Sequence, residues 1–241
     1  MKKGISIMIP VYNEEEILVK NTKRLIKFLN KLKFPYEILL CDNGSTDNTP
    51  NLGKKLQSQF PKKVKFLSIP ESRSVGFAFK KMVEVSSFNN LISLDMDLST
   101  NFEYFIPKCL ELLKNNSMVI GSKMGKQKRP FYRKMMSNIF IFLVKIFLGL
   151  EFSDYSIGAK GYRKDHIIDK LDAIDRGTFY VIKLVYFLKK ENLRITEIPV
   201  EVYDVRKSRF NIFQDAIYRG INLLNFLFRE RIIKIISKIP K

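Results

Sequence analysis

Four short apolar runs in the first hundred residues alternate with segments whose apolar side chains recur at helical spacing. Proline, glycine or acidic residues close each run, as they commonly close strands. Strands and helices in regular alternation predict a parallel sheet joined by right-handed crossovers. We therefore expect an α/β fold with a mostly parallel, Rossmann-like sheet flanked by helices. The predicted strands span residues 5–9, 37–41, 64–69 and 91–94, and two of the predicted helices span 49–60 and 75–85.

The second half of the chain does not continue the regular alternation of strands and helices. It begins with a basic stretch over 121–134, and a further strand is predicted at 194–203. From residue 211 the apolar side chains return to helical spacing. A chain of 241 residues can hold one sizeable domain with a helical appendage. We expect one domain over 1–205, with halves 1–100 and 101–205, and then a basic loop and amphipathic helical tail over 206–241.

The chain carries 43 Lys and Arg against 24 Asp and Glu, a formal net charge of +19. Such a charge attracts polyanions: nucleic acid, anionic lipid headgroups or phosphorylated substrates. The two cysteines, Cys41 and Cys109, are far apart and have no metal-ligand spacing, so we expect neither a disulfide framework nor a zinc site, and a reducing compartment. His166 is the single histidine, which disfavours catalysis by a histidine triad.

The longest apolar stretch, residues 139–150, is interrupted by Lys145 and is shorter than the ~20 residues that a membrane-spanning helix needs. We expect no span and no signal peptide. The segment 229–241 alternates isoleucine with lysine and arginine, a pattern that favours an anionic membrane surface. The alternative is a helix that packs its apolar face on the domain.

Asp95 and Asp97 directly follow the fourth predicted strand. Because a strand directs alternate side chains to the same side, the two carboxylates converge where the strand leaves the sheet. Such a pair can hold a hard divalent cation, which in turn holds a diphosphate. The alternative is two solvated acids in a turn.

Other polar segments follow the other predicted strands. Residues 10–14 follow the first, 42–47 the second and 73–76 the third, where Gly76 is expected to let the backbone approach a ligand. Helix capping explains Asp47, but it does not explain three acidic strand ends on one edge. Since ligands bind at the carboxyl ends of parallel strands, these segments predict one site.

Two of these segments carry a family resemblance. Residues 9–14 (Ile-Pro-Val-Tyr-Asn-Glu) and 42–47 (Asp-Asn-Gly-Ser-Thr-Asp), together with the Asp-x-Asp pair, resemble family-2 glycosyltransferases of GT-A fold. Within that family the chain is similar to polyprenyl-phosphate sugar synthases, such as dolichyl-phosphate mannose and glucose synthases, over nearly its whole length. The resemblance implies that Mg²⁺ or Mn²⁺ and the sugar nucleotide bind Asp95 and Asp97. It also implies that the nucleotide contacts Pro10, Tyr12, Glu14 and Asp42.

The resemblance extends to the acceptor side. Gly121-Ser122-Lys123 is similar to a Gly-Ser-Arg motif, with Lys123 in the place of the arginine. One branch of the family has a glutamine metal ligand where this chain has Ser99, and the loop between Arg206 and Ser208 is shorter than in mannose synthases. The residues that would hold an acceptor phosphate are Lys123, Arg133, Asp154, Lys160, Arg206 and Arg209.

The cationic residues on the acceptor side suggest that the molecule that receives the sugar carries a phosphate. A lipid monophosphate, with a second pKa of about 6, is already an anionic nucleophile, so it needs cations that dock it and no general base. We therefore predict an inverting transfer of mannose or glucose from GDP-mannose or UDP-glucose to a polyprenyl phosphate. We expect the enzyme at the cytoplasmic face of a membrane, attached to its anionic surface. The residues expected to serve catalysis are Asp95, Asp97, Lys123 and Arg133.

Two alternatives remain open. A family-2 enzyme could transfer its sugar to a hydroxyl group of a glycan or glycolipid, with Asp154 as the base. A basic, non-catalytic binding protein on the same scaffold is the other. Nucleic acid is not an expected partner, because most of the aromatic residues fall at core spacing and are not interleaved with basic ones on a surface.

Overall fold

The computed structural model describes residues 3–69, 74–123, 131–203 and 212–236. The chain divides into two compact units. The first comprises Met1–Gly125 and Asp154–Val205, and the second comprises Lys126–Ser153 and Arg206–Lys241. The segment Lys126–Ser153, which the sequence places within a domain over 1–205, thus groups with the C-terminal segment.

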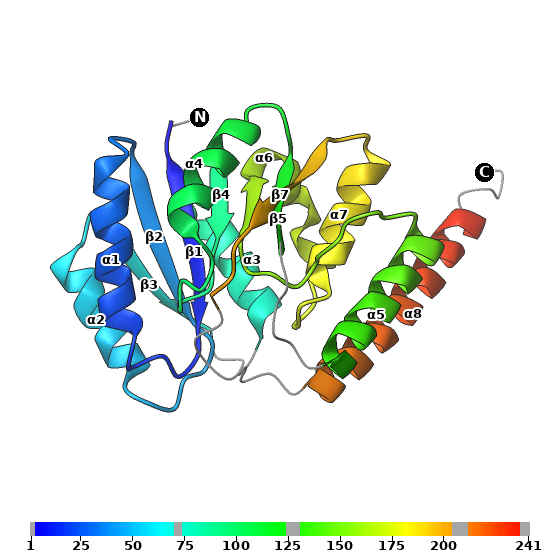
Figure 1. The fold of residues 1–241 in the computed structure, drawn as a ribbon, viewed down its shortest axis with the longest axis horizontal. Helices are drawn as coiled ribbons and strands as arrows, with labels where there is room; N and C mark the ends of the chain where they lie inside the picture. Colours follow the sequence, from blue (N-terminus) through cyan, green and yellow to red (C-terminus); the bar gives the residue numbers. More distant parts are fainter. Residues whose placement is uncertain (1–2, 70–73, 124–130, 204–211, 237–241) are drawn as a thin grey trace. The chain divides into compact units, whose positions relative to one another are not determined.

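In the described part of the first unit, seven strands form one sheet in the order β3-β2-β1-β4-β6-β5-β7 (Figure 1). Strand β6 is antiparallel to both of its neighbours, and the other neighbouring pairs are parallel. The predicted α/β fold with a mostly parallel sheet is therefore confirmed. The strands are β1 (Ile5–Val11), β2 (Tyr36–Asp42), β3 (Val64–Ser68), β4 (Asn90–Ser93), β5 (Met118–Lys123), β6 (Lys160–Arg163) and β7 (Ile195–Val200).

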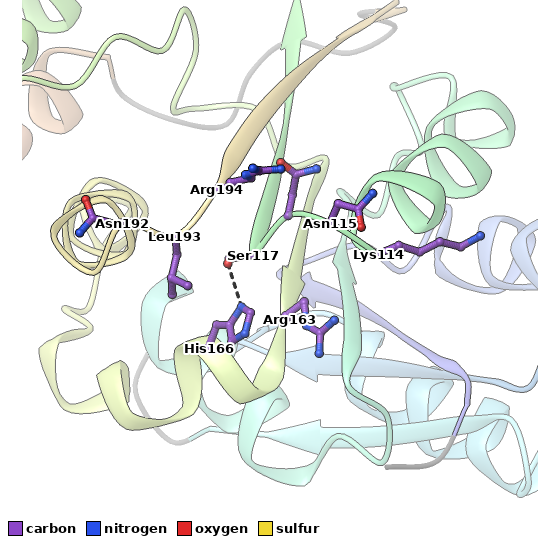
Figure 2. A pocket seen from close by; sticks show the side chains of 9 residues that line it. Lys114, Asn115, Ser117, Arg163, His166, Asn192, Leu193 and Arg194 are labelled. Carbon is purple, nitrogen blue, oxygen red and sulfur yellow. Dashed lines mark hydrogen bonds between the residues drawn. The ribbon is translucent and has the colours of Figure 1, made fainter.

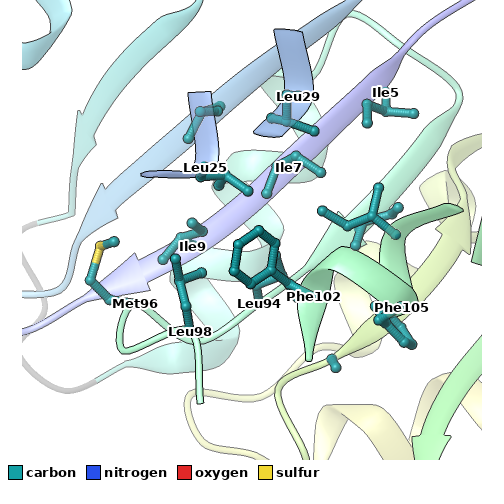
Figure 3. Packing of buried hydrophobic residues seen from close by; sticks show 14 of the residues in the cluster. Ile5, Ile7, Ile9, Leu25, Leu29, Leu94, Met96, Leu98, Phe102 and Phe105 are labelled. Atoms are coloured by element: carbon teal, nitrogen blue, oxygen red, sulfur yellow. The ribbon is translucent and has the colours of Figure 1, made fainter. Parts of the chain in front are cut away.

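Helices flank this sheet, and the main core lies between the sheet and two of them. Ile5, Ile7 and Ile9 of β1 point to the face where Leu25 of α1 and Phe102 of α4 pack (Figure 3). The period of two in β1 and the period of 3.6 in the helices bring these side chains together. The helical elements of the first unit are α1 (Leu18–Lys31), α2 (Thr49–Gln59), α3 (Val75–Val85), α4 (Phe102–Leu112), α6 (Lys164–Ile167), the 3₁₀ helix η1 (Ile168–Ala173) and α7 (Tyr180–Lys190).

Pro10 lies inside β1, so the prediction that it ends this strand is wrong. Strand β4 pairs with β1 only as far as Met8, whereas β2 pairs with β1 as far as Val11. The carbonyl of Met8 faces β4 and that of Val11 faces β2, so alternation turns Pro10 toward the side that β4 has already left. A proline without an N–H group is tolerated there because no neighbouring strand needs its hydrogen bond.

Strands β5 and β6 were not among the strands predicted from the sequence. Strand β6 is four residues long and contains Gly161, so it has no apolar run or alternation to indicate it. The glycine is required by a long-range contact, since a Cβ placed on Gly161 would lie 2.1 Å from the Sγ of Cys109 in α4. The period that reveals a strand is therefore hidden by the packing of a neighbouring helix.

The described part of the second unit consists of two helices, α5 (Phe131–Leu148) and α8 (Ile212–Ile236), which lie side by side (Figure 1). Helix α5 begins before the apolar stretch at 139–150 and includes the basic residues Arg133 and Lys134. No helix in the described residues combines the length and apolar character that crossing a membrane requires.

Glu37, at the start of β2, is a buried carboxylate that is fully engaged. Its Oε1 accepts a hydrogen bond of 2.7 Å from the Ser6 hydroxyl, and its Oε2 lies 2.7 Å from the Lys65 Nζ. The Ser87 hydroxyl donates to Oε2 at 3.0 Å, and the Ser87 amide donates to Oε1. Burial by itself raises the pKa of Glu37, but the bonds from Lys65, Ser87 and Ser6 outweigh it and lower the pKa.

We expect Glu37→Gln to reduce the free energy of unfolding by about 1–3 kcal/mol at pH 7, because charge-assisted bonds to a buried group are lost. A lowered native pKa means that this stabilisation is present above the ordinary glutamate pKa and is lost as the pH falls through the native value. Urea unfolding at pH 7 and below pH 4 checks both points, and the variant should lose part of the acid sensitivity. Glu111→Gln, in an exposed ion pair with Lys108, is the matched control and should change little. Equal stability of Glu37→Gln and the parent protein at pH 7 would contradict this account.

Candidate active site

The carboxyl ends of β1, β2 and β4 lie next to one another at one edge of the sheet. Strand β1 pairs in parallel with β2 on one side and with β4 on the other. Backbone bonds continue past the strands: the Leu94 amide donates to the Met8 carbonyl at 3.1 Å, and the Asn43 amide donates to the Val11 carbonyl at 2.9 Å. The segments that follow these three strands therefore share one edge, the place where open α/β sheets bind ligands.

The loop after β1 is fixed on the loop after β2 by side-chain bonds to backbone amides. The Asn13 amide donates to the Ser45 hydroxyl at 2.8 Å, and the Asn13 Oδ1 accepts from the Thr46 amide at 2.7 Å. The Glu14 amide donates to the Thr49 hydroxyl at 2.8 Å. Asn13 has a φ of +54°, a left-handed conformation that asparagine tolerates better than most residues. These bonds hold the loop after β1 in one conformation.

The four residues predicted to contact the nucleotide lie on these two loops and strand ends. Asp42 is the last residue of β2, is 3% exposed, and accepts a hydrogen bond of 3.2 Å from the Ser45 amide. Pro10, Tyr12 and Glu14 are all partly buried along the end of β1 and its loop. The structure thus places all four at the same edge of the sheet.

Asp95 and Asp97 lie in a tight turn after β4. Met96 and Leu98, which alternate with them, are buried in the core (Figure 3), so the two acids are directed away from it. The Leu98 amide donates to the Asp95 carbonyl at 3.1 Å, and Leu98 has a φ of +49°. The Ser99 amide donates to the Asp97 Oδ1 at 3.0 Å and orients that carboxylate. A leucine in the left-handed region is strained, and its buried side chain is what keeps the turn in this form.

Asp95 has an unusual electrostatic environment. The residue is open to solvent on one side, while protein surrounds its carboxyl group on the other. This burial and the negative charge of Asp97 raise the pKa of Asp95 above its ordinary value. The positive charges of Lys160 and Lys123 and the Gly158 amide act in the opposite direction. The two acids are therefore close enough to repel one another, and a bound cation would relieve that repulsion.

Gly158 lies directly against Asp95 and is a site residue that sequence reasoning missed. A Cβ placed on Gly158 would lie 2.3 Å from the Cγ and both carboxyl oxygens of Asp95, so an added side chain would displace that carboxylate. The Ser93 hydroxyl donates to the Gly158 carbonyl at 2.6 Å and fixes this backbone. The glycine is visible in the segment 154–163, but its partner becomes apparent only when β6 is placed beside β4.

Lys123, Asp154 and Lys160 form the second half of the charged cluster. Lys123 ends β5, and its Nζ lies 3.8 Å from the Oδ2 of Asp154, with both side chains about 15% exposed. The Asp154 Oδ1 accepts bonds from the Ser156 amide at 2.6 Å and the Ile157 amide at 3.2 Å. Lys160, at the start of β6, is buried and donates to the Ile157 carbonyl.

Asp154 is held in its ionised form. Burial by itself raises the pKa of Asp154, but the charge of Lys123, the bonds from Ser156 and the charge of Lys160 outweigh it and lower the pKa. A carboxylate with a lowered pKa and with hydrogen bonds at one oxygen and a lysine at the other is a weak general base near neutral pH. Asp154 therefore serves to orient Lys123.

The segment after β7 runs beside the turn that carries the two acids. Thr100 forms an isolated antiparallel bridge with Val202, and the Tyr203 amide donates to the Ser99 carbonyl at 2.7 Å. The loop with Arg206 and Arg209 follows immediately in the chain, and both residues lie outside the described residues. Arg133 belongs to α5 of the second unit, and its side chain also lies outside the description.

Asp47 and Gly76 serve contacts within the protein. The Asp47 Oδ1 accepts a bond of 2.9 Å from the amide of Thr49, the first residue of α2, and its Oδ2 accepts one of 3.2 Å from the Glu15 amide, while the N-cap position itself is held by Asn48. A Cβ placed on Gly76 would lie 1.8 Å from the Asp175 carbonyl oxygen. The close approach that the structure shows at Gly76 is to the chain itself, and an approach of its backbone to a ligand stays a prediction. Arg73, three residues earlier, lies outside the described residues.

The two carboxylates suit a hard divalent cation. Among the residues that the structure describes, no group of three or more His, Cys, Asp or Glu residues is placed to hold a metal ion by itself. Mg²⁺ and Mn²⁺ often bind one or two carboxylates and take their other ligands from phosphate groups and water. Asp95 and Asp97 fit a cation of this kind.

A cavity of about 240 Å³ lies at the opposite edge of the sheet, around His166 (Figure 2). The His166 Nδ1 lies 2.8 Å from the Ser117 hydroxyl. Ser117 precedes β5 and Arg194 precedes β7, so the cavity lies where these strands begin. It does not belong to the edge that holds Asp95.

The sequence of this chain is similar to those of known glycosyltransferases. The family model for Glycosyl transferase family 2 matches residues 6–170. The undecaprenyl-phosphate 4-deoxy-4-formamido-L-arabinose transferase of Salmonella choleraesuis (strain SC-B67) is 29% identical over 228 residues. The enzyme of that name from Serratia proteamaculans (strain 568) is 28% identical over 231 residues. Each alignment covers 94% of this chain and 66% of the relative.

Solved structures show the same fold. Glucosyl-3-phosphoglycerate synthase from Mycobacterium tuberculosis, in complex with Mn²⁺, UDP-glucose and phosphoglyceric acid, has a TM-score of 0.66 at 16% identity. That alignment covers 93% of this chain and 80% of the synthase, and its UDP complex has a TM-score of 0.63. The sheet and its flanking helices match the expected GT-A fold, and the family resemblance is confirmed. With residues 6–170 matched by the family model, the chain belongs to glycosyltransferase family 2.

Proposed function

We propose that the protein transfers a sugar from a nucleoside-diphosphate sugar to a polyprenyl phosphate. The observation that carries this proposal is that the charges of Lys123 and Lys160 act on Asp95, with the ionised carboxylate of Asp154 3.8 Å from Lys123. Cations that adjoin a metal-binding pair suit an anionic acceptor next to the reacting carbon. The relatives from Salmonella and Serratia are named as undecaprenyl-phosphate transferases. Their names support a polyprenyl phosphate as the acceptor.

On the donor side, Asp95 and Asp97 would hold Mg²⁺ or Mn²⁺, and this ion would neutralise the charge that develops on the departing diphosphate. Pro10, Tyr12, Glu14 and Asp42 would bind the nucleotide. Ser99 would act through its amide, which fixes the Asp97 carboxylate. The fold of the Mn²⁺ and UDP-glucose complexes supports this arrangement.

On the acceptor side, a phosphate oxygen would form the new bond to the anomeric carbon as the bond from that carbon to the diphosphate breaks. Attack from the face opposite the leaving group inverts the configuration. Lys123, Lys160 and the arginines 133, 206 and 209 would dock the phosphate. A hydroxyl acceptor would need a base, and the lowered pKa of Asp154 disfavours it for that role.

The sugar is a further part of the proposal. A hexose, mannose or glucose, follows from the resemblance to the dolichyl-phosphate synthases, whereas the curated relatives are named for a formamido-arabinose. Thermal shifts with GDP-mannose, UDP-glucose and the nucleotide-linked arabinose derivative, each with Mg²⁺ or Mn²⁺, separate these donors. Stabilisation by the arabinose donor alone would overturn the hexose assignment.

We expect Lys123→Gln to lower the acceptor-dependent rate about 10- to 150-fold, because a charge-assisted contact to phosphate is lost. Donor hydrolysis without acceptor should change little, and Lys123→Arg should keep most of the transfer activity. Lys108→Gln, at an exposed ion pair on α4, is the matched control. Transfer to polyprenol as fast as transfer to polyprenyl phosphate would contradict the proposal.

The proposed acceptor implies a location. A polyprenyl phosphate resides in a membrane, and a net charge of +19 favours the anionic surface of a cytoplasmic leaflet. We propose that the protein works there, bound to that surface.

A further inference from the structure

Helices α5 and α8 expose an unusual amount of apolar surface. The described residues include twelve large apolar side chains that are exposed, and nine of them lie on these two helices. The other three, Tyr104, Ile168 and Tyr203, are scattered over the first unit. Isolated apolar residues are normal on a surface, whereas a concentration of this kind marks an interaction site.

The exposed residues form one stripe on each helix. Met135, Ile139, Phe142 and Ile146 form the α5 stripe, and Ile217, Ile221, Leu224 and Phe228 form the α8 stripe. Both stripes repeat at intervals of four, three and four residues, which keeps four side chains on one helical face. Each of the eight side chains is at least 46% exposed.

The opposite faces of the two helices are packed. Val144 of α5 and Leu223 and Phe226 of α8 are buried, and they lie about half a helical turn away from the stripes. The Arg219 guanidinium lies 5.9 Å from the Phe140 ring centre and links the two helices. Each helix therefore already has a packed face, and its stripe is a second apolar face.

The net charge of this unit favours an anionic partner for the two stripes. Segments 126–153 and 206–241 together carry 15 Lys and Arg against 3 Asp and Glu. Two copies of so basic a unit repel one another, which disfavours a second copy of the chain as the partner. An anionic lipid leaflet offers both a negative surface for the cations and an apolar layer for the stripes.

We propose that the α5 stripe and the α8 stripe insert into the acyl boundary of an anionic membrane leaflet while the helices stay in the interface. The inference rests on the proposed function, because a lipid-linked acceptor requires contact with a membrane. It adds which surface of the protein contacts the membrane, and that this contact is made by insertion of apolar side chains. Apolar insertion holds the protein in the leaflet, and the basic residues select an anionic one.

Tryptophan fluorescence provides a direct test, because the chain contains no tryptophan. Phe142→Trp and Phe228→Trp each place a single reporter on one stripe of the full chain, and Tyr104→Trp on α4 is the matched control. With vesicles of equal parts phosphatidylglycerol and phosphatidylcholine, the emission of both stripe reporters should shift to shorter wavelength, and that of the control should not. An unchanged spectrum at either stripe would overturn the insertion of both.

Serine variants test how much the stripes contribute to binding. Ile139→Ser with Phe142→Ser, and separately Leu224→Ser with Phe228→Ser, should each lower the partition coefficient for the same vesicles at least about 100-fold in co-sedimentation, on the scale of losing two buried apolar side chains. Tyr104→Ser with Ile168→Ser removes exposed apolar surface elsewhere and should leave binding unchanged. Unchanged vesicle binding of the stripe variants, with a shift from dimer to monomer, would identify the stripes as a self-association surface and overturn the proposal.

A soluble acceptor separates this inference from the proposed function. The stripe variants should transfer sugar to a short-chain, water-soluble polyprenyl phosphate at the rate of the parent protein, while losing transfer to the vesicle-borne lipid. If the parent protein inserts both stripes but transfers no sugar to either acceptor, the proposed function fails and the membrane surface stands. If transfer to vesicle-borne lipid is unchanged in the stripe variants, the membrane surface fails and the proposed function stands.

Discussion

Asp97→Ala is expected to abolish the dependence of donor binding on a divalent cation and to lower turnover at least about 100-fold, on the scale of losing one preorganised charge contact at a developing negative charge. The physical reason is the pair of interacting carboxylates. The charge of Asp97 helps to raise the pKa of Asp95, and a bound cation would relieve that repulsion. Without Asp97, one carboxylate would have to hold the ion alone. Calorimetric titration of the sugar nucleotide with Mn²⁺, and then with EDTA, measures the effect.

Two control measurements test whether this effect is specific to the metal site. Mn²⁺ without donor should raise the melting temperature of the parent protein, because a ligand that binds only the folded state stabilises it, and Asp97→Ala should remove that increase. Asp172→Ala, which removes a fully exposed carboxylate paired with Lys80, should retain both behaviours. The metal site is wrong if Asp97→Ala, or the parent protein in EDTA, binds and turns over donor as well as the parent protein does with Mn²⁺.

Gly158→Ala is expected to lower turnover by about 100-fold while the protein stays folded, because a displacement of a catalytic group by about 1 Å costs that much. The new methyl group would lie 2.3 Å from the Asp95 carboxyl, so the carboxylate must move. Asp95 is open to solvent on its other side and has room to do so. The loss should therefore appear in metal affinity and rate, measured by Mn²⁺ titration and steady-state kinetics.

Two other glycines serve as controls for Gly158. A Cβ on Gly220 of α8 would meet nothing within 4 Å, so Gly220→Ala should keep full activity and be slightly stabilising. A Cβ on Gly161 would lie 2.1 Å from the buried Cys109 Sγ, so Gly161→Ala should lower stability more than it lowers the specific activity of the folded fraction. Normal metal affinity in Gly158→Ala would show that Asp95 does not hold the cation.

Local patterns in the sequence were sufficient to predict the half of the sheet that follows parallel βαβ rules. The strands that carry Asp42 and Asp95 are continuous apolar runs, and the acids at their ends reach one edge by topology alone. A glycine such as Gly76 indicates a close approach without saying to what, and the partner that the structure shows is the Asp175 carbonyl, about a hundred residues away along the chain.

In the other half of the sheet, β7 agrees with the strand predicted at 194–203, whereas β5 and β6 depend on contacts that no local pattern encodes. Strand β6 shows no alternation of apolar and polar residues. Gly161 has no side chain because Cys109 packs against it, and Lys160 is buried with its amine bonded to the Ile157 carbonyl of the same segment. The role of Gly158 follows from the position of Asp95, which lies more than sixty residues earlier in the sequence. The lowered pKa of Asp154 likewise depends on Lys123, which β5 brings close.

The order of the strands gives β6 a role beyond that of its own residues. Within the described sheet, the hydrogen-bond ladder from β3 to β4 continues to β5 and β7 through β6, a strand of four residues, and the bridge between Thr100 and Val202 adds a second link beyond the strand ends. Asp95 and Asp97 follow β4 on one side of this link, and Lys123 ends β5 on the other. A register slip of one residue between β4 and β6 would carry β5 along by about 3.3 Å and turn the side chains of β6 to the opposite face. The separation between the carboxylate pair after β4 and Lys123 at the end of β5 thus depends on the ladder bonds of one short strand.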